Sequence, residues 1–107
     1  MTDFFMERDD KILAATKRII EREGLSALTR EKIADEAGLS IGSVSNYGLT
    51  SITNSPAPKE GYRARILSGL MKQAVDRADV KMVRVGLADG CLKLDALPDF
   101  LRKAVAA

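Results

Sequence analysis

Histidine is absent from this chain of 107 residues, and cysteine occurs once, as Cys91. Without an imidazole, every mechanism that depends on a histidine base, a histidine-containing triad or a histidine metal site is excluded. A single thiol forms neither an intrachain disulfide nor a multi-thiolate zinc site, and it fits a reducing compartment. We therefore expect a protein that is not an enzyme, with no catalytic residue, no bound metal and no cofactor.

Long apolar runs are also missing. No stretch approaches the ~20 apolar residues of a membrane span, and no segment has the composition of a secretory signal. Hydrophobic residues make up 46% and charged residues 30% of the chain, and the net charge is +2. This balance and this length are typical of one globular domain. We expect a cytoplasmic protein that makes no contact with a membrane.

Apolar residues at helical spacing predict three helices in the first half of the chain. The first covers residues 9–23 and stops at Gly24, the second covers residues 29–38, and the third, short helix covers residues 41–47. Residues 4–6, Phe-Phe-Met, precede the first helix, and we interpret them as an arm outside it. Together these elements form a predicted unit over residues 9–47.

Residues 48–58 separate this unit from the rest of the chain. They carry no charge and are rich in Ser, Thr, Asn and Pro, which is typical of a loop. Such an insertion fits a specificity element, a minor-groove arm or a mobile loop, and the mobile loop is the default interpretation.

Residues 59–107 are predicted to form a helical tail that packs on the same core. A long amphipathic helix runs to about Ala78. Residues 80–85 alternate as a strand does, but helix is favoured because a lone strand has no partner. Residues 86–90 are interpreted as a helix interruption, and Pro98 opens a last helix. The predicted apolar face of this last helix comprises Phe100, Leu101, Ala104 and Val105.

Several side chains of this tail have ordinary structural interpretations. Tyr62 and Ile66 are expected in the core, and Cys91 is expected to be a buried small apolar residue. Arg63 and Arg65 could contact phosphate, but they are interpreted as part of a solvated helix face. The fold class is therefore all-α: a three-helix unit followed by a short α-helical tail.

Residues 29–47, which read TREKIADEAGLSIGSVSNY, have the residue types of a helix-turn-helix. Ala34 is small where the two helices cross closely. Gly38 can take the positive φ that the turn requires, and Ser40 is placed to cap the following helix. The outward positions of that helix are then Gly42, Ser43, Ser45 and Asn46. A helix held in this way can place its N-terminal residues in the major groove of DNA.

At these residues the chain resembles the tetracycline-repressor (TetR-type) regulators. The resemblance rests on Ile12-Leu13-Ala14-Ala15, Glu23-Gly24, Leu28-Thr29, Ile33-Ala34, Ala37-Gly38-Leu39-Ser40 and Gly42-Ser43-Val44, in family order and spacing. It implies a three-helix DNA-binding domain in a homodimeric repressor that acts on two-fold operators. The DNA-contacting residues expected on this basis are Thr29, Arg30, Ser40, Ile41, Gly42, Ser43, Ser45, Asn46, Tyr47 and Lys59.

The chain departs from the family at several places. Ser45 stands where the family usually has an aromatic residue, and Gly48 stands where it has a core Phe. We expect Lys59 to be the equivalent of the lysine that opens the fourth helix, so residues 48–58 are longer than the family's connection. Fewer residues follow Lys59 than a ligand-binding domain needs, so no small-molecule inducer is expected. The helical tail would provide the dimer contact, as in small phage- or plasmid-borne regulators.

The distribution of charge leaves a second function class open. Residues 1–36 carry seven basic and nine acidic side chains, a net of −2, and the predicted third helix has no Lys or Arg. Because phosphate attraction supplies most non-specific affinity, a monomer should bind DNA weakly, which favours a dimer. The alternative is a helical protein–protein adaptor or antirepressor that keeps the fold without binding DNA.

Overall fold

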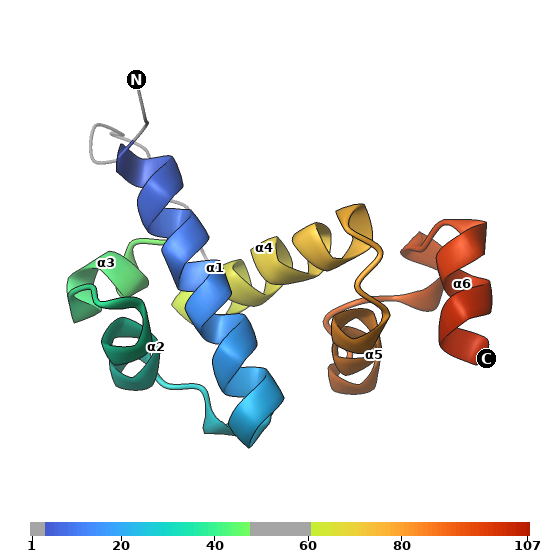
Figure 1. Cartoon of the computed structure of the whole chain (residues 1–107), viewed down its shortest axis with the longest axis horizontal. Helices are drawn as coiled ribbons and strands as arrows, with labels where there is room; N and C mark the ends of the chain where they lie inside the picture. The colour runs from blue at the N-terminus through green and yellow to red at the C-terminus, as the bar shows by residue number, and fades with distance from the viewer. Residues whose placement is uncertain (1–3, 48–60) are drawn as a thin grey trace. The chain divides into compact units, whose positions relative to one another are not determined.

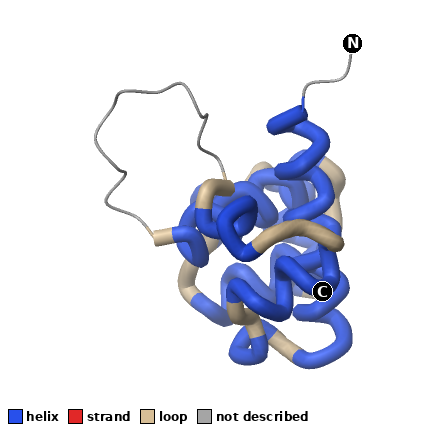
Figure 2. Tube along the Cα trace, turned by 90° about the vertical axis from the view of Figure 1, so that its left-hand side faces the viewer, coloured by secondary structure: helices blue, strands red, loops and turns tan. Residues whose placement is uncertain are grey.

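The computed structural model describes residues 4–47 and 61–107, with side chains from residue 7 onward in the first range. Within these ranges every regular element is a helix and no strand is present (Figure 2). The all-α prediction is therefore confirmed. The expected loop at residues 48–58, and Lys59, lie outside the described residues. The α-helices are α1 (Phe4–Glu23), α2 (Arg30–Ala37), α3 (Ile41–Ser45), α4 (Tyr62–Asp76), α5 (Val80–Asp89) and α6 (Asp99–Ala106), with 3-10 turns at Leu25–Ala27 and Leu94–Ala96.

Helix α1 begins earlier than the sequence predicts. It starts at Phe4, so the interpretation of residues 4–6 as an arm was wrong. No Gly or Pro interrupts this stretch, and Glu7 lies in the first turn, where a negative side chain interacts favourably with the helix dipole. The extra turn brings Arg8 into the helix.

The first compact unit, Met1–Ile66, contains the predicted helix-turn-helix. Helix α1 packs against α2, and α2 packs against α3 (Figure 1). Ile12, Ile33 and Val44 each expose 1% or less of their surface. Thr16 is also fully buried, and its hydroxyl donates to the carbonyl of Ile12 at 2.8 Å, so its polar group is satisfied. Burial on this scale holds helices that are too short to be stable alone.

The second compact unit, Leu67–Ala107, has its own buried apolar residues. Leu70, Met71, Met82, Val83 and Leu101 expose 2% or less of their surface. Helix α5 packs against α6, and the Arg84 guanidinium donates from Nη2 to the carbonyls of Ala104 and Ala107 at 3.3 and 3.2 Å. A cation at the end of α6 interacts favourably with the helix dipole.

Residues 80–85 are helical, as favoured, but the interpretation of residues 86–90 as an interruption was wrong. Helix α5 continues to Asp89, and Gly90 ends it with a φ of 89°. Gly86 is buried inside the helix, where an added Cβ would collide with the sulfur of Met71. Gly86 therefore allows Met71 to pack closely against the helix, and only Gly90 ends it.

Two side chains of the second unit, Cys91 and Phe100, are more exposed than predicted. Cys91 is exposed, beside Met71 and Leu92 in a hollow of the surface, so it is not the buried apolar residue that we expected. On α6, Leu101 is fully buried but Phe100 exposes 60% of its surface, because adjacent helical positions point about 100° apart. Leu94, in the preceding 3-10 turn, exposes 52%.

Candidate nucleic-acid interface

The turn between α2 and α3 has the geometry that its sequence predicts. Thr29 caps α2 by accepting a hydrogen bond from the backbone N–H of Lys32 at 3.1 Å. Gly38 ends the helix with φ 70°, and the N–H of Leu39 donates to the carbonyl of Ala34 at 3.0 Å. These two features are the left-handed cap and the 6→1 hydrogen bond of a Schellman-type helix end. They fix the direction in which the chain enters α3.

Helix α3 begins at a side-chain cap. The hydroxyl of Ser40 accepts from the N–H of Ser43 at 3.1 Å, and the two hydroxyls lie 3.0 Å apart. Val44 is fully buried, so it anchors the helix on the core. On the outer side Ile41 exposes 46% of its surface, and Gly42 is exposed with only the Ser40 hydroxyl near the position that a Cβ would take. The N-terminal turn of α3 is therefore open to a partner.

The predicted contact residues fall into three groups by exposure. Most of them lie on the surface of the first unit around α3. The exposed ones are Thr29, Arg30, Ser40, Ile41, Gly42 and Asn46; Ser43 and Ser45 are half-buried, and Tyr47 is buried. Lys59 lies outside the described residues. The structure thus brings nine of the ten predicted residues onto one helix-turn-helix and its immediate ends.

Arg30 connects three helices rather than standing alone on the surface. Its Nη1 donates to the hydroxyl of Ser45 at 3.3 Å, and its guanidinium lies over the ring of Tyr62, 5.5 Å from the centroid. Tyr62 is half-buried and packs under this cation, so it is not simply a core residue as predicted. The contact places a positive charge from α2 beside α3.

Two further arginines bind the C-terminal end of α3, and sequence reasoning predicted neither contact. Arg65, from α4, donates from Nε to the carbonyl of Tyr47 at 2.9 Å and from Nη2 to that of Ser45 at 2.5 Å. Arg8, from α1, donates from Nη2 to the carbonyl of Asn46 at 3.2 Å. Arg65 is half-buried and held to the backbone, so its interpretation as part of a solvated face was wrong. The sequence did contain a signal for such contacts: no glycine immediately follows α3, so its last carbonyls need hydrogen-bond donors from elsewhere in the chain.

The side chain of Tyr47 lies in this same region and exposes 8% of its surface. Burial raises the pKa of its phenol, and the negative charges of Asp9 and Asp10 raise it further. The phenol is therefore neutral at physiological pH.

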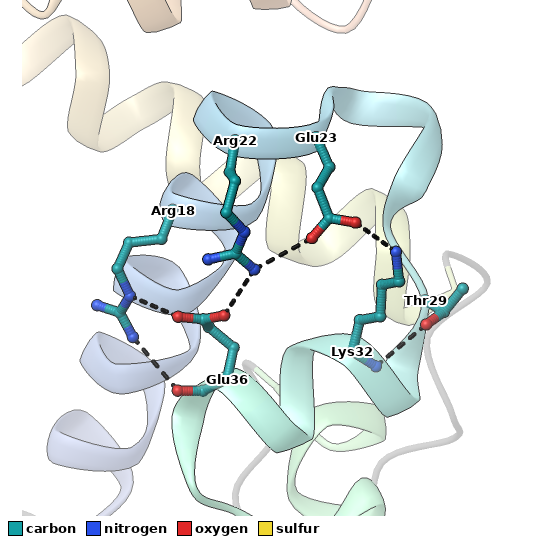
Figure 3. A network of polar contacts seen from close by, with 6 residues as sticks. All are labelled: Arg18, Arg22, Glu23, Thr29, Lys32 and Glu36. Carbon is teal, nitrogen blue, oxygen red and sulfur yellow. Dashed lines mark hydrogen bonds and ion pairs between the residues drawn. The ribbon is translucent and has the colours of Figure 1, made fainter.

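A set of ion pairs holds α1 and α2 together behind the turn (Figure 3). Glu36 accepts from Arg18 at 3.0 Å and from Arg22 at 2.9 Å, and Glu23 accepts from Lys32 at 2.6 Å. Hydrogen bonds lower the pKa of Glu36, the one from Arg22 more than the one from Arg18. They also lower the pKa of Glu23, where the bond from Lys32 has the larger effect and that from Arg22 the smaller. These five charged side chains pair with one another, whereas Arg30 places its charge beside α3.

The helix-turn-helix lies in a segment that is similar to a known protein family. The segment 12–47 matches the tetR family of bacterial regulatory proteins. This match confirms the predicted resemblance for a TetR-type N-terminal DNA-binding domain, and it indicates a DNA-binding transcriptional regulator. Neither a curated protein nor a solved structure matches the chain.

The tetR match ends at Tyr47, where the Arg8 and Arg65 contacts also lie. It covers the helix-turn-helix and most of α1 but no part of α4, α5 or α6. Across residues 4–47 and 61–107, no helix combines the length and the apolar character that crossing a membrane requires. Among the described side chains, no three His, Cys, Asp or Glu residues gather as they would around a metal ion.

Proposed function

We propose that this protein is a sequence-specific DNA-binding regulator that represses transcription in the cytoplasm as a homodimer and has no catalytic activity of its own. The observation that carries the proposal is the exposed N-terminal turn of α3, capped by Ser40 and mounted on a glycine turn within the tetR-matching segment. A helix presented in this way fits the major groove of B-DNA.

In this proposal the side chains of α3 read bases while the surrounding residues bind phosphate. Ile41 offers an apolar contact for a thymine methyl, and Asn46 can bond an adenine edge through both its amide oxygen and its amide nitrogen. Thr29, Arg30 and Lys59 would contact the phosphate backbone of the DNA, with Arg30 acting together with the Ser45 hydroxyl. Tyr47, which exposes 8% of its surface, is too buried for the phosphate contact expected of it.

Dimer formation is proposed to involve the second unit. Leu94 and Phe100 expose 52% and 60% of their surfaces there, and large apolar side chains of this kind are enriched at protein interfaces. Light scattering at several concentrations should give twice the mass of one chain, 11.6 kDa. Phe100→Ser should shift the molecules toward monomers, and a monomeric wild-type protein would contradict this part of the proposal.

Fluorescence anisotropy tests the proposed binding directly. The full chain is titrated onto a duplex from the region upstream of its own gene and onto a scrambled duplex, each at two salt concentrations. Preference for the first duplex supports the regulator. Equal, weak binding that disappears with salt would favour the adaptor, which is the alternative consistent with a third helix that has no charged side chain.

Asn46→Ala gives a residue-level test of base reading. Asn46 is exposed at the end of α3, so its loss should leave the fold intact. The substitution should cost about 1–3 kcal/mol of binding to the preferred duplex and relax the preference at one base pair. An unchanged preference across duplexes with single base changes would remove Asn46 from the set of reading residues.

A further inference from the structure

The last turn of α3 does not end in a glycine. Asn46, the residue that follows the helix, has φ −95° and ψ 11°, which is not the left-handed conformation that satisfies the final carbonyls of many helices. The helix itself is five residues long and its sequence, IGSVS, carries no charge. A helix this short is not stable without tertiary contacts. The position of Asn46 therefore depends on groups outside α3.

Those groups are two arginines. Arg65 and Arg8 together donate hydrogen bonds to three consecutive carbonyls, those of Ser45, Asn46 and Tyr47. Hydrogen bonds from a charged donor are stronger than neutral ones, and the guanidinium fork can reach two acceptors in fixed geometry. The two positive charges also lie at the C-terminal end of α3, where the helix dipole favours cations.

The two arginines approach α3 from different helices of the first unit. Arg8 lies on α1 and exposes only 6% of its side chain, and it also pairs with Asp9 at 3.1 Å. Arg65 lies on the first turns of α4. Their bonds to α3 end on backbone oxygens, so they constrain the path of the chain whatever side chains it carries.

We propose that Arg65 and Arg8 are positioning residues for base reading, which hold the backbone of residues 45–47 so that the exposed Asn46 side chain meets the DNA in one orientation. The inference rests on the proposed function. It assigns the two arginines a role through α3, and it separates them from phosphate contacts such as the one proposed for Arg30. Loss of the fork should loosen the end of α3 and leave the turn that Ser40 caps unchanged.

Arg65→Lys tests this role, because it keeps the positive charge and removes the fork. Arg63→Lys is the matched control, since Arg63 lies two residues earlier on α4 and is also half-buried. The first readout is amide hydrogen exchange of the full chain without DNA. The reporters are the N–H groups of Asn46 and Tyr47, which donate to Gly42 and Val44 at 3.0 and 3.1 Å. The N–H of Leu39 at the turn serves as the internal reference.

In Arg65→Lys, exchange of the Asn46 and Tyr47 amides should rise about tenfold or more while that of Leu39 stays within about twofold. Arg63→Lys should change neither. Arg8→Lys, which removes the single bond to Asn46, should raise exchange at the same two amides by a smaller factor. Unchanged exchange in both Arg65→Lys and Arg8→Lys would overturn the proposal without involving DNA.

The second readout is anisotropy with the preferred and the scrambled duplex at two salt concentrations. For Arg65→Lys, affinity for the preferred duplex should fall about tenfold, with little change for the scrambled duplex and the same salt dependence as wild type. If Arg65 instead contacted phosphate, Arg65→Lys, which keeps the charge, would leave both affinities and the salt slope nearly unchanged. Arg65→Gln, which removes the charge, would then lower both affinities alike and reduce the salt slope by about 1. That result would overturn the positioning role.

Failure of this inference and failure of the proposed function give different results. A wild-type protein that binds both duplexes equally removes the proposed function and base reading with it. A wild-type protein that prefers one duplex, combined with an Arg65→Lys variant that keeps the whole preference, overturns the inference alone.

Discussion

Two glycines four residues apart, Gly38 and Gly42, should respond in opposite directions to substitution by alanine. Gly38 has φ 70°, and nothing lies within 4 Å of the position that a Cβ would occupy. The cost of Gly38→Ala is therefore the cost of placing an L-residue in the left-handed region, about 1–2 kcal/mol of unfolding free energy. No steric clash adds to it.

At Gly42 the backbone does not need the left-handed conformation that Gly38 adopts. It lies inside α3, its φ is not positive, and a Cβ added there would lie 3.8 Å from the Ser40 hydroxyl, an ordinary contact. Gly42→Ala should therefore raise the unfolding free energy by about 0.5–1 kcal/mol, because alanine loses less conformational entropy in a helix. The two variants should differ from each other by about 1.5–3 kcal/mol.

Urea unfolding followed by far-ultraviolet circular dichroism measures both changes. All proteins are compared at one concentration, because association would make the midpoint depend on it. Equal slopes with different midpoints would attribute the effect to stability alone. If Gly38→Ala leaves the unfolding free energy unchanged, or if Gly42→Ala lowers it as much as Gly38→Ala does, then the argument from the φ angles of the two glycines is refuted. If Gly42→Ala is more stable but binds DNA less tightly, then the glycine serves the interface rather than the fold.

Three further predictions concern the core and the dependence on pH. Leu101→Ala should lower the unfolding free energy by about 2–5 kcal/mol because Leu101 is fully buried, whereas Lys103→Ala on the exposed side of α6 should change it by less than about 0.5 kcal/mol in the same urea experiment. Because the pKa of Glu36 is lowered from its ordinary value of 4.5, its ion pairs stabilise the fold above that pH and are lost as pH falls through the folded value; Glu36→Gln should therefore lose less stability on acidification than wild type, and an identical acid limb would contradict this. The pKa of Tyr47 is raised above 10.0, so its contribution is complete below that pH and is lost as pH rises through the folded value; Tyr47→Phe should keep more of its stability in alkali, as thermal unfolding between neutral pH and about pH 11 would show.

Local sequence signals predicted the turn correctly because its geometry is set by neighbouring residues. Thr29 and Ser40 cap helices through bonds that span three residues, and Gly38 ends α2 through its own φ. Each of these effects acts within one turn of helix, so the residue types alone carry the information.

The contacts that sequence reasoning missed are long-range. Arg8 and Asn46 are 38 residues apart, and Arg65 and Ser45 are 20 apart. An arginine on a helix looks the same in sequence whether it faces water or another helix's carbonyls. The same limit explains Phe100, because the pattern placed it on an apolar face without indicating how wide the covered part of that face is.

Gly86 shows a different limit. In sequence, Gly86 and Gly90 are equally good candidates for the end of a helix. In the structure Gly90 ends α5, and Gly86 lies inside it. Whether the first glycine breaks the helix or admits a neighbour depends on Met71, which packs against it from α4. Only tertiary structure supplies that neighbour.

The attachment of α3 through backbone atoms has a consequence for how binding preference can change. Arg8 and Arg65 hold carbonyl oxygens, which every amino acid possesses, and the exposed side chains of Ile41 and Asn46 take no part in those bonds. The atoms that support the helix and the atoms that it presents to a partner are therefore different. Under the proposed function, substitutions at the outward positions would alter the recognised sequence one base pair at a time while the support stays constant. New specificities would then be reachable from this scaffold without passing through an unfolded intermediate, in evolution or in selection experiments.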